Sequence, residues 1–307
     1  MVNADRAEVD RQLPLGEEIF LDHVGHFVAD REEASHALAR CGFAPTPVSV
    51  QVTPDGTLTG TGNVCAMLPR GYIEVLFKTV ATPLAAELDL SMARYPGVHL
   101  AAFAVADAGR AHGRLGAEGF ALRPLVSMRR PVDTETGPST AAFTVARVER
   151  GAMAEGRIQI LTHHTEAAVW QKRWLAHPNG ARALASAVIV VRDVEEAAAR
   201  FARFTGRDAI SRRVGAVFAL DRGRVELVTR TAFEAALPEI AVPSLPFIGA
   251  YGIVVASLDA LEATFARAGL RTRRVSSYLV APFPEELGQG GWLFAESGDA
   301  SRFVPTT

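Results

Sequence analysis

The chain has little of what several catalytic classes require. Among its 307 residues 32 are basic, and of these only Lys78 and Lys172 are lysines; the rest are arginines. Neither lysine stands in a G-x-x-x-x-G-K-[ST] frame, which excludes a phosphate-binding P-loop. A Schiff-base enzyme would have to use one of these two lysines. The two cysteines, Cys41 and Cys65, form no C-x-x-C motif and are too few for a disulfide framework or an all-thiolate zinc site.

The chain also lacks a charge excess and a long apolar run. Its 32 basic and 34 acidic residues give a formal charge of -2, so no surplus of positive charge is present to bind nucleic acid. The longest apolar runs, such as residues 100–106, fall far short of a membrane span. The N-terminus is charged from the start and has no signal-peptide core. We expect a cytoplasmic protein that binds neither nucleic acid nor membrane.

A repeated pattern dominates what the sequence does contain. Four times an apolar strand runs into a helix-capping residue, and a glycine that can end the helix follows 12 or 13 residues later. Each helix then leads into strand-like stretches. The capping residues are Asp30, Asp107, Asp193 and Ser257, and the last strands of the four units read YIEVL at 72–76, RIQIL at 157–161, RVELV at 224–228 and WLFAE at 292–296.

The repeat predicts an α+β fold of four βαβββ units in two tandem domains. Between the second and third units, Thr165 can cap a short helix through Trp174, and the turn at 177–180 ends it. Trp170 and Trp174 are four residues apart and would share one helix face. We therefore expect an N-terminal extension over 1–18, a first domain over 19–180 and a second over 181–307.

Paired units that open with L-D-H-V and close with an I-E-V strand resemble the vicinal oxygen chelate superfamily, which includes glyoxalase I, methylmalonyl-CoA epimerase, extradiol dioxygenases and bleomycin-resistance proteins. The stretches HHTEAAVWQKRWLAHPNGA and GYIEVL resemble, more narrowly, the glyoxalase-like domain proteins. This resemblance implies that each pair of units forms a half-open barrel with a divalent metal inside it, bound by the first and last strands of each unit.

Carried over to this chain, the implied metal-ligand positions are only partly filled. The first-strand position lies seven residues before each cap. The first unit alone has strong ligands at both this position and the last-strand position, namely His23 and Glu74. The second domain therefore reads as degenerate, without its own metal. In the other units the two positions hold Leu100 and Gln159, Ser186 and Glu226, and Ala250 and Phe294.

A substitute ligand for Leu100 can be argued from strand alternation. His163 lies four residues after Gln159 and should share its face, whereas His99 and His164 should point away. His23, Glu74 and His163 would form a two-histidine, one-carboxylate set that suits Fe(II), Mn(II), Zn(II) or Ni(II), and Gln159 could add a neutral oxygen. As the alternative, each of these residues is structural and no metal binds.

Further residues are candidates for the same pocket. One of Arg129 and Arg130 should point inward, and we take Arg129 to bind a substrate carboxylate. Trp170 and His164 are the other predicted substrate contacts. A carboxylate in an apolar strand needs a metal, a basic partner or open water to offset its burial. Glu74 is also the predicted catalytic residue, since in the metal-dependent case it, or a metal-bound hydroxide, could shuttle a proton.

Two functions from different classes follow. The first is a metal-dependent lyase, isomerase or dioxygenase whose small substrate chelates the metal through neighbouring oxygens. The second is a metal-free protein that binds and sequesters a small molecule, as in the bleomycin-resistance branch. A degenerate scaffold without a ligand and assembly as a homodimer both stay open.

Overall fold

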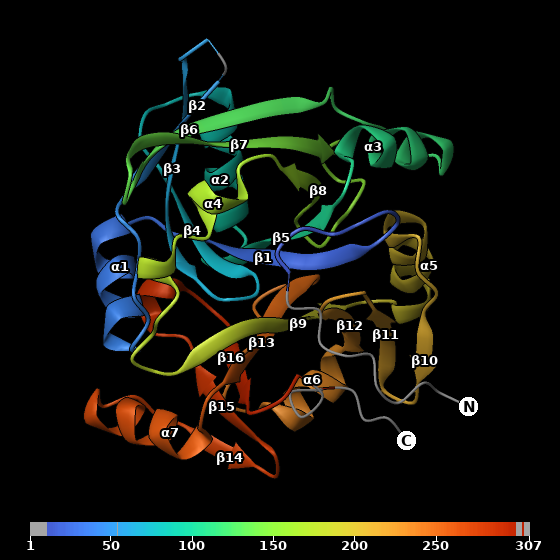
Figure 1. The fold of residues 1–307 in the computed structure, drawn as a ribbon. Helices are drawn as coiled ribbons and strands as arrows, with labels where there is room; N and C mark the ends of the chain where they lie inside the picture. The colour runs from blue at the N-terminus through green and yellow to red at the C-terminus, as the bar shows by residue number, and fades with distance from the viewer. Residues whose placement is uncertain (1–10, 54, 299–302, 304–307) are drawn as a thin grey trace.

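The computed structural model describes residues 11–53, 55–298 and 303, which build two eight-stranded sheets and seven α-helices (Figure 1). The first two βαβββ units form the first sheet. Its strands and helices are β1 (Ile19–Phe27), α1 (Arg31–Arg40), β2 (Ser49–Val52), β3 (Leu58–Met67), β4 (Tyr72–Lys78), α2 (Pro83–Met92), β5 (Gly97–Val105), α3 (Ala108–Ala117), β6 (Val126–Thr134), β7 (Gly137–Arg147) and β8 (Arg157–His163).

The other two units form the second sheet, with strand order β10-β11-β12-β9-β13-β16-β15-β14. Figure 1 places this sheet beneath the first one, with β9 crossing close to β1. Its elements are β9 (Ala181–Val191), α5 (Val194–Thr205), β10 (Ile210–Arg212), β11 (Gly215–Ala219), β12 (Arg224–Thr229), α6 (Arg230–Ala236), β13 (Phe247–Val255), α7 (Leu258–Arg267), β14 (Arg273–Val275), β15 (Tyr278–Pro282), η2 (Glu285–Leu287) and β16 (Gly291–Ala295).

All four predicted helix starts are confirmed. Asp30, Asp107, Asp193 and Ser257 each accept hydrogen bonds from backbone N–H groups in the first turn of the helix that follows. The glycines at the other ends have φ between 66° and 82°, the left-handed region that lets the chain turn back into a strand. Local sequence therefore sets where each unit turns from strand to helix.

The linker between the sheets differs from the prediction. Instead of one helix through Trp174, it contains a single turn, α4 (Glu166–Val169), and a 3-10 turn, η1 (Lys172–Trp174). The Thr165 hydroxyl makes no cap, because it accepts a hydrogen bond from Ala142 N of β7 instead. The two tryptophans therefore do not share one helix face: Trp170 is buried and Trp174 is half-buried.

The first sheet closes on itself, in the order β1-β4-β3-β2-β6-β7-β8-β5, rather than forming the half-open barrel that we expected. One pair, Val52↔Arg129, joins β2 to β6 and closes the ring. The other ladders have three or more pairs each, and β6 and β7 are paired from Val126 to Thr134. The barrel is thus complete but has a weak seam between β2 and β6. In the described part of the chain, no helix has the length and apolar character needed to cross a membrane.

Candidate functional site

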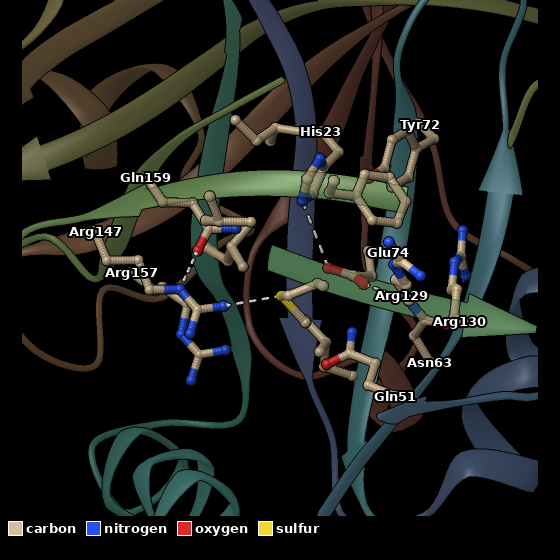
Figure 2. Close-up of a pocket in the computed structure, with 16 residues that line it drawn as sticks. His23, Gln51, Asn63, Tyr72, Glu74, Arg129, Arg130, Arg147, Arg157 and Gln159 are labelled. Carbon is tan, nitrogen blue, oxygen red and sulfur yellow. Dashed lines mark hydrogen bonds and ion pairs between the residues drawn. The ribbon is translucent and has the colours of Figure 1, made fainter. Parts of the chain in front are cut away.

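The barrel contains a cavity whose lining combines apolar side chains with a few converging polar groups, as small-molecule sites do. Side chains from all eight barrel strands line it, and Figure 2 shows them converging on one interior. The lining consists of His23, Gln51, Asn63, Tyr72, Glu74, Leu76, Leu100, Met128, Arg129, Arg130, Phe143, Val145, Arg147, Arg157, Gln159 and Leu161.

His23 and Glu74 meet inside this cavity. The Nε2 atom of His23 lies 3.5 Å from Glu74 Oε2, and both residues are buried (Figure 2). β1 and β4 are parallel neighbours that pair His23 with Tyr72, so Glu74 lies two residues further along the adjacent strand on the same face. The imidazole stacks on the Tyr72 ring at 4.3 Å, which fixes its plane. The structure therefore brings together the two strong ligand positions of the first unit.

An extra residue in β1 supplies a carboxylate that the sequence analysis missed. The pairing of β1 with β5 skips from Leu21↔Phe103 to His23↔Ala102, so Asp22 is an unpaired residue at an irregularity in the ladder. Asp22 is fully buried and bridges two histidines, His23 Nδ1 at 2.7 Å and His163 Nε2 at 3.0 Å. An aspartate within an apolar strand was the available signal, because burying an unpaired carboxylate is costly.

The bridging carboxylate is ionised. Burial alone would raise the pKa of Asp22, but the charge and hydrogen bond of His163, and those of His23, hold that pKa below its usual range. Both histidines therefore donate to it, which orients His23 with Nδ1–H toward Asp22 and leaves Nε2 toward the cavity.

His163 is not beside Glu74, contrary to the prediction. Its side chain is buried against the rings of Trp170 and Phe143, bonded to Asp22, and does not line the cavity. Strand alternation predicts the face on which His163 lies but not its position along the barrel. Four residues of strand span about 13 Å, so His163 lies far along β8 from Gln159. Within the described residues, no group of three histidine, cysteine or acidic side chains could hold a metal ion.

Gln159, the predicted neutral ligand, is also hydrogen-bonded to another residue. Gln159 points into the cavity as expected, but its Oε1 accepts a hydrogen bond from Arg147 Nε at 3.0 Å. Leu100 lines the cavity as well, while His99 faces away and bonds to Tyr95 O. The alternation argument for these positions is confirmed.

Four arginines and one carboxylate line the cavity: Arg129, Arg130, Arg147, Arg157 and Glu74. Arg130 Nη1 donates to Asn63 Oδ1 at 3.0 Å, and Asn63 Nδ2 donates to Glu74 Oε1 at 2.5 Å. Arg157 Nη2 lies 3.5 Å from Glu87, outside the lining. Loss of hydration, with a smaller contribution from the charge of Arg157, lowers the pKa of Arg147 to about 9. The interior is therefore an electropositive chamber.

The other predicted substrate contacts have different positions. Arg129 lines the cavity but is exposed, and its neighbour Arg130 makes the interior hydrogen bond. Trp170 packs on Tyr72 and His163 below the cavity wall, so that expected contact is not made. His164 is exposed and bonds to Thr144 Oγ1 on the outside of the barrel, because it follows the inward-facing His163 in the alternation.

Comparison with protein families identifies the lineage of this barrel. The model of the glyoxalase-like domain family matches residues 21–205, more than half of the chain. The chain belongs to the glyoxalase-like domain family. The match begins in β1 and runs through the linker into β9 and α5. The resemblance drawn from L-D-H-V and GYIEVL is thereby confirmed.

Solved structures share the fold at low sequence identity. A hypothetical protein from Staphylococcus aureus superposes with a TM-score of 0.64 at 9% identity, covering 90% of this chain and 98% of its own. A mutant of 4-hydroxymandelate synthase from Streptomyces coelicolor gives 0.57 at 11%, covering 91% and 93%. A xylose isomerase-like TIM barrel/4-hydroxyphenylpyruvate dioxygenase fusion protein gives 0.54 at 10%, covering 96% and 52%. A comparison with curated protein sequences gives no match.

The donor set of this glyoxalase-like domain does not fit a catalytic divalent metal. Such sites use three protein ligands plus an open position. In the part of the chain that the structure describes, His23 and Glu74 approach each other, but no third histidine, cysteine or acidic side chain joins them. Leu100 offers no donor atom, and the Gln159 oxygen is bonded to an arginine. The positive charges of the four guanidinium groups around the chamber also disfavour binding of a metal cation.

The ligand positions in the second sheet are closed by packing. Ser186, Ala250 and Phe294 are fully buried, and so is Glu226. The Glu226 carboxylate accepts from Arg224 Nε at 2.8 Å, and this salt bridge offsets its burial. The polar chamber of this glyoxalase-like protein therefore belongs to the first sheet.

Proposed function

We propose that the barrel of this glyoxalase-like protein binds a small organic anion without a metal, and that the His23–Glu74 pair moves a proton on it. This proposal takes the metal-free side of the two functions that the sequence left open, and adds acid–base chemistry to it. The observation that carries it is Arg147, a half-buried guanidinium in a cavity that three further arginines line.

Arg147 has no acidic partner among the described residues. Its Nε donates to the neutral Gln159, and its Nη2 lies 3.7 Å from the sulfur of Met128. Withdrawing a charge even partly from water without a counter-ion is costly. A bound carboxylate would offset that cost with a charge-assisted, bidentate hydrogen bond, and Arg157 on the adjacent strand would add to the attraction.

The His23–Glu74 pair is arranged to exchange a proton with such a ligand. Because His23 Nδ1–H donates to Asp22, its Nε2 carries a lone pair when the ring is neutral. Glu74 Oε1 accepts from Asn63, which leaves Oε2 facing that lone pair at 3.5 Å. Two acceptors so close favour one proton between them. Such a pair can take a proton from a ligand carbon and return it elsewhere, the step an isomerase or lyase needs.

We also propose that the chain is a tandem of two glyoxalase-like domains divided near residue 180, with the second domain degenerate. The support is that each half repeats the order βαβββ twice, and that the second sheet begins at Ala181.

Anion binding is tested by calorimetry and thermal shift with a panel of acetate, pyruvate, malonate and benzoate. At least one should raise the melting temperature, because a ligand that binds only the folded state stabilises it. Arg147→Met should weaken that ligand by about 10- to 100-fold, the value of a charge-assisted hydrogen bond. Arg150→Met is the matched control, since it removes one charge from an exposed arginine next to β7. Equal binding by the two variants would contradict the proposal.

Proton transfer is tested by deuterium incorporation at the carbon next to the carbonyl of bound 2-oxo acids, followed by NMR in D₂O. His23→Gln and Glu74→Gln should abolish incorporation while the anion still binds. Incorporation that persists in both variants would remove the acid–base role and leave a binding protein.

A metal-dependent lyase, isomerase or dioxygenase is the second candidate function. The close approach of His23 and Glu74 favours it, since these are the two strong ligand positions of the first unit. Elemental analysis of protein purified without chelator separates the candidates. Stoichiometric Fe, Mn, Zn or Ni that is lost in His23→Ala would support the metal. Metal-free protein whose melting temperature is unchanged by all four ions would support the anion site alone.

A further inference from the structure

A second hollow opens at the seam of the barrel. We call it the seam groove. It is bounded by the chain entering β2, the inward and edge residues of β6, the start of β7 and the linker turns α4 and η1. Its lining consists of Thr46, Pro47, Val48, Ser49, Met67, Arg130, Pro131, Val132, Asp133, Pro138, Ser139, Ala168, Val169, Gln171, Arg173 and Trp174.

The groove exists because the β2–β6 ladder stops after one pair. If the antiparallel register of Val52↔Arg129 continued, Val50 would face Pro131 and Ser49 would face Val132. Proline has no N–H to donate, so it cannot extend the ladder. The strands pair no further, and the residues that would have been neighbours, Ser49 and Val132, both line the hollow between them.

The seam groove continues the barrel cavity. On β6 three alternate side chains mark the change from one hollow to the other. Met128 lines the cavity, Val132 lines the groove, and Arg130 between them lines both. On β2 the same change occurs from Gln51, in the cavity, to Ser49, in the groove. Arg130 is the residue common to both linings.

Two polar atoms at this junction have no hydrogen-bond partner among the residues that the structure describes. Arg130 Nε and Ser49 Oγ are buried without a hydrogen bond, although Arg130 Nη1 donates to Asn63. Beyond them the walls are mainly apolar, formed by Val48, Val132 and Val169. Val48 is 46% exposed, so a ligand in the groove could bury it. Asp133 and Arg173 also line the groove, and Arg173 Nη2 donates to the Asp133 carbonyl.

We infer that the ligand is an amphipathic organic acid whose anionic group binds Arg147 in the cavity, and whose apolar arm passes Arg130 through the seam into the groove. This inference rests on the proposed anion site and adds the class of ligand. A polar head in the electropositive chamber and an apolar arm along valine and tryptophan side chains match the chemistry of the two hollows.

A homologous series of straight-chain carboxylates, from acetate to decanoate, tests the inference by calorimetry on the full chain. Affinity should rise with length by up to about fourfold per methylene, the value of burying a CH₂ group, and then level off when the groove is full. Acetate reports the Arg147 site alone, because it has no arm.

Two groove variants and a matched control complete the design. Val48→Asp and Val132→Asp should flatten the rise with chain length and leave acetate affinity within about twofold. Ile210→Asp, at a residue 41% exposed on the second sheet, should change neither.

The two proposals fail in different ways. If acetate binds through Arg147 but affinity does not rise with length, the groove is not a subsite and the anion site stands. A rise that survives both groove variants likewise overturns the inference. If no carboxylate of any length binds, the proposed function and this inference fall together.

Discussion

Single side chains connect the interior of the barrel into one polar chain. Arg130 donates to Asn63, Asn63 donates to Glu74, and Glu74 faces His23. Asp22 then joins His23 to His163. Each member has its geometry set by the next, so the orientation of His23 depends on a carboxylate that does not itself touch the cavity.

Asp22→Asn tests that dependence at the residue scale. The amide cannot accept from both histidines as the carboxylate does, so a buried hydrogen-bonded charge is lost. We expect the free energy of unfolding to fall by about 3 kcal/mol and deuterium incorporation into a bound 2-oxo acid to stop. Urea denaturation and NMR measure the two effects. Asp208→Asn, at an exposed position, is the control, and an Asp22 variant as stable and active as that control would contradict this role.

The strands β1 and β5 carry the site through a close approach that only glycine allows. A Cβ atom on Gly25 would lie 2.9 Å from Leu100 Cβ and 3.1 Å from Leu76 Cδ1. Gly25 also pairs with Leu100 across the ladder and with Glu74 on the parallel side. The absence of a side chain at 25 therefore lets Leu100 enter the cavity wall.

A double-mutant cycle tests this contact between elements. Gly25→Ala should destabilise the protein by about 1–3 kcal/mol through overpacking, and Leu100→Ala by about 2–5 kcal/mol through the cavity it leaves. Combined, they should cost at least about 1 kcal/mol less than the sum, since the smaller side chain makes room for the new methyl group. Urea denaturation of the four proteins gives the coupling energy, and strict additivity would refute it.

In the repeated units, local sequence determines several features of each helix and strand. The caps, the glycine stops and the inward faces of Leu100 and Gln159 follow from residue types and a period of two. The same alternation places Arg157, two residues before Gln159, on the inward face of β8, so it also predicts Arg157 in the cavity lining. What alternation could not predict is Asp22, because the extra residue in β1 interrupts the period.

The two sheets are joined by a buried hydrogen-bonded histidine. His26 of β1 donates from Nδ1 to Leu287 O and accepts at Nε2 from Tyr251 Oη, which itself accepts from Trp292 Nε1. Both ring nitrogens are satisfied only in the neutral form. Burial, with a smaller contribution from His99, lowers the pKa of His26 to about 4.

Stability should therefore fall with acidification. An unfolded histidine has a pKa near 6.5, so between pH 6.5 and 4 the unfolded chain binds more protons, and the contribution present above pH 6.5 is lost as pH falls. At pH 5 the loss from His26 should be about 2 kcal/mol. The difference between the denaturant midpoints at pH 7.5 and pH 5.0 should be smaller for His26→Phe than for the native chain.

His36→Gln, at an exposed histidine of α1, should keep the full pH dependence. The slope that remains in the His26 variant is expected from His99, whose pKa burial also lowers to about 4. An unchanged slope in His26→Phe would show that the interface histidine does not titrate as described.

The sequence by itself determined the repeating elements, their ends and which face of each strand points inward, because these depend on residues within a few positions of one another. The tertiary structure decided which inward side chains meet. Strand order brought Arg147 and Arg157 together with Gln159, an irregular pairing turned Asp22 between two histidines, and the depth of His163 along its strand separated it from Glu74. Those outcomes depend on register between strands far apart in the chain, which no local pattern specifies.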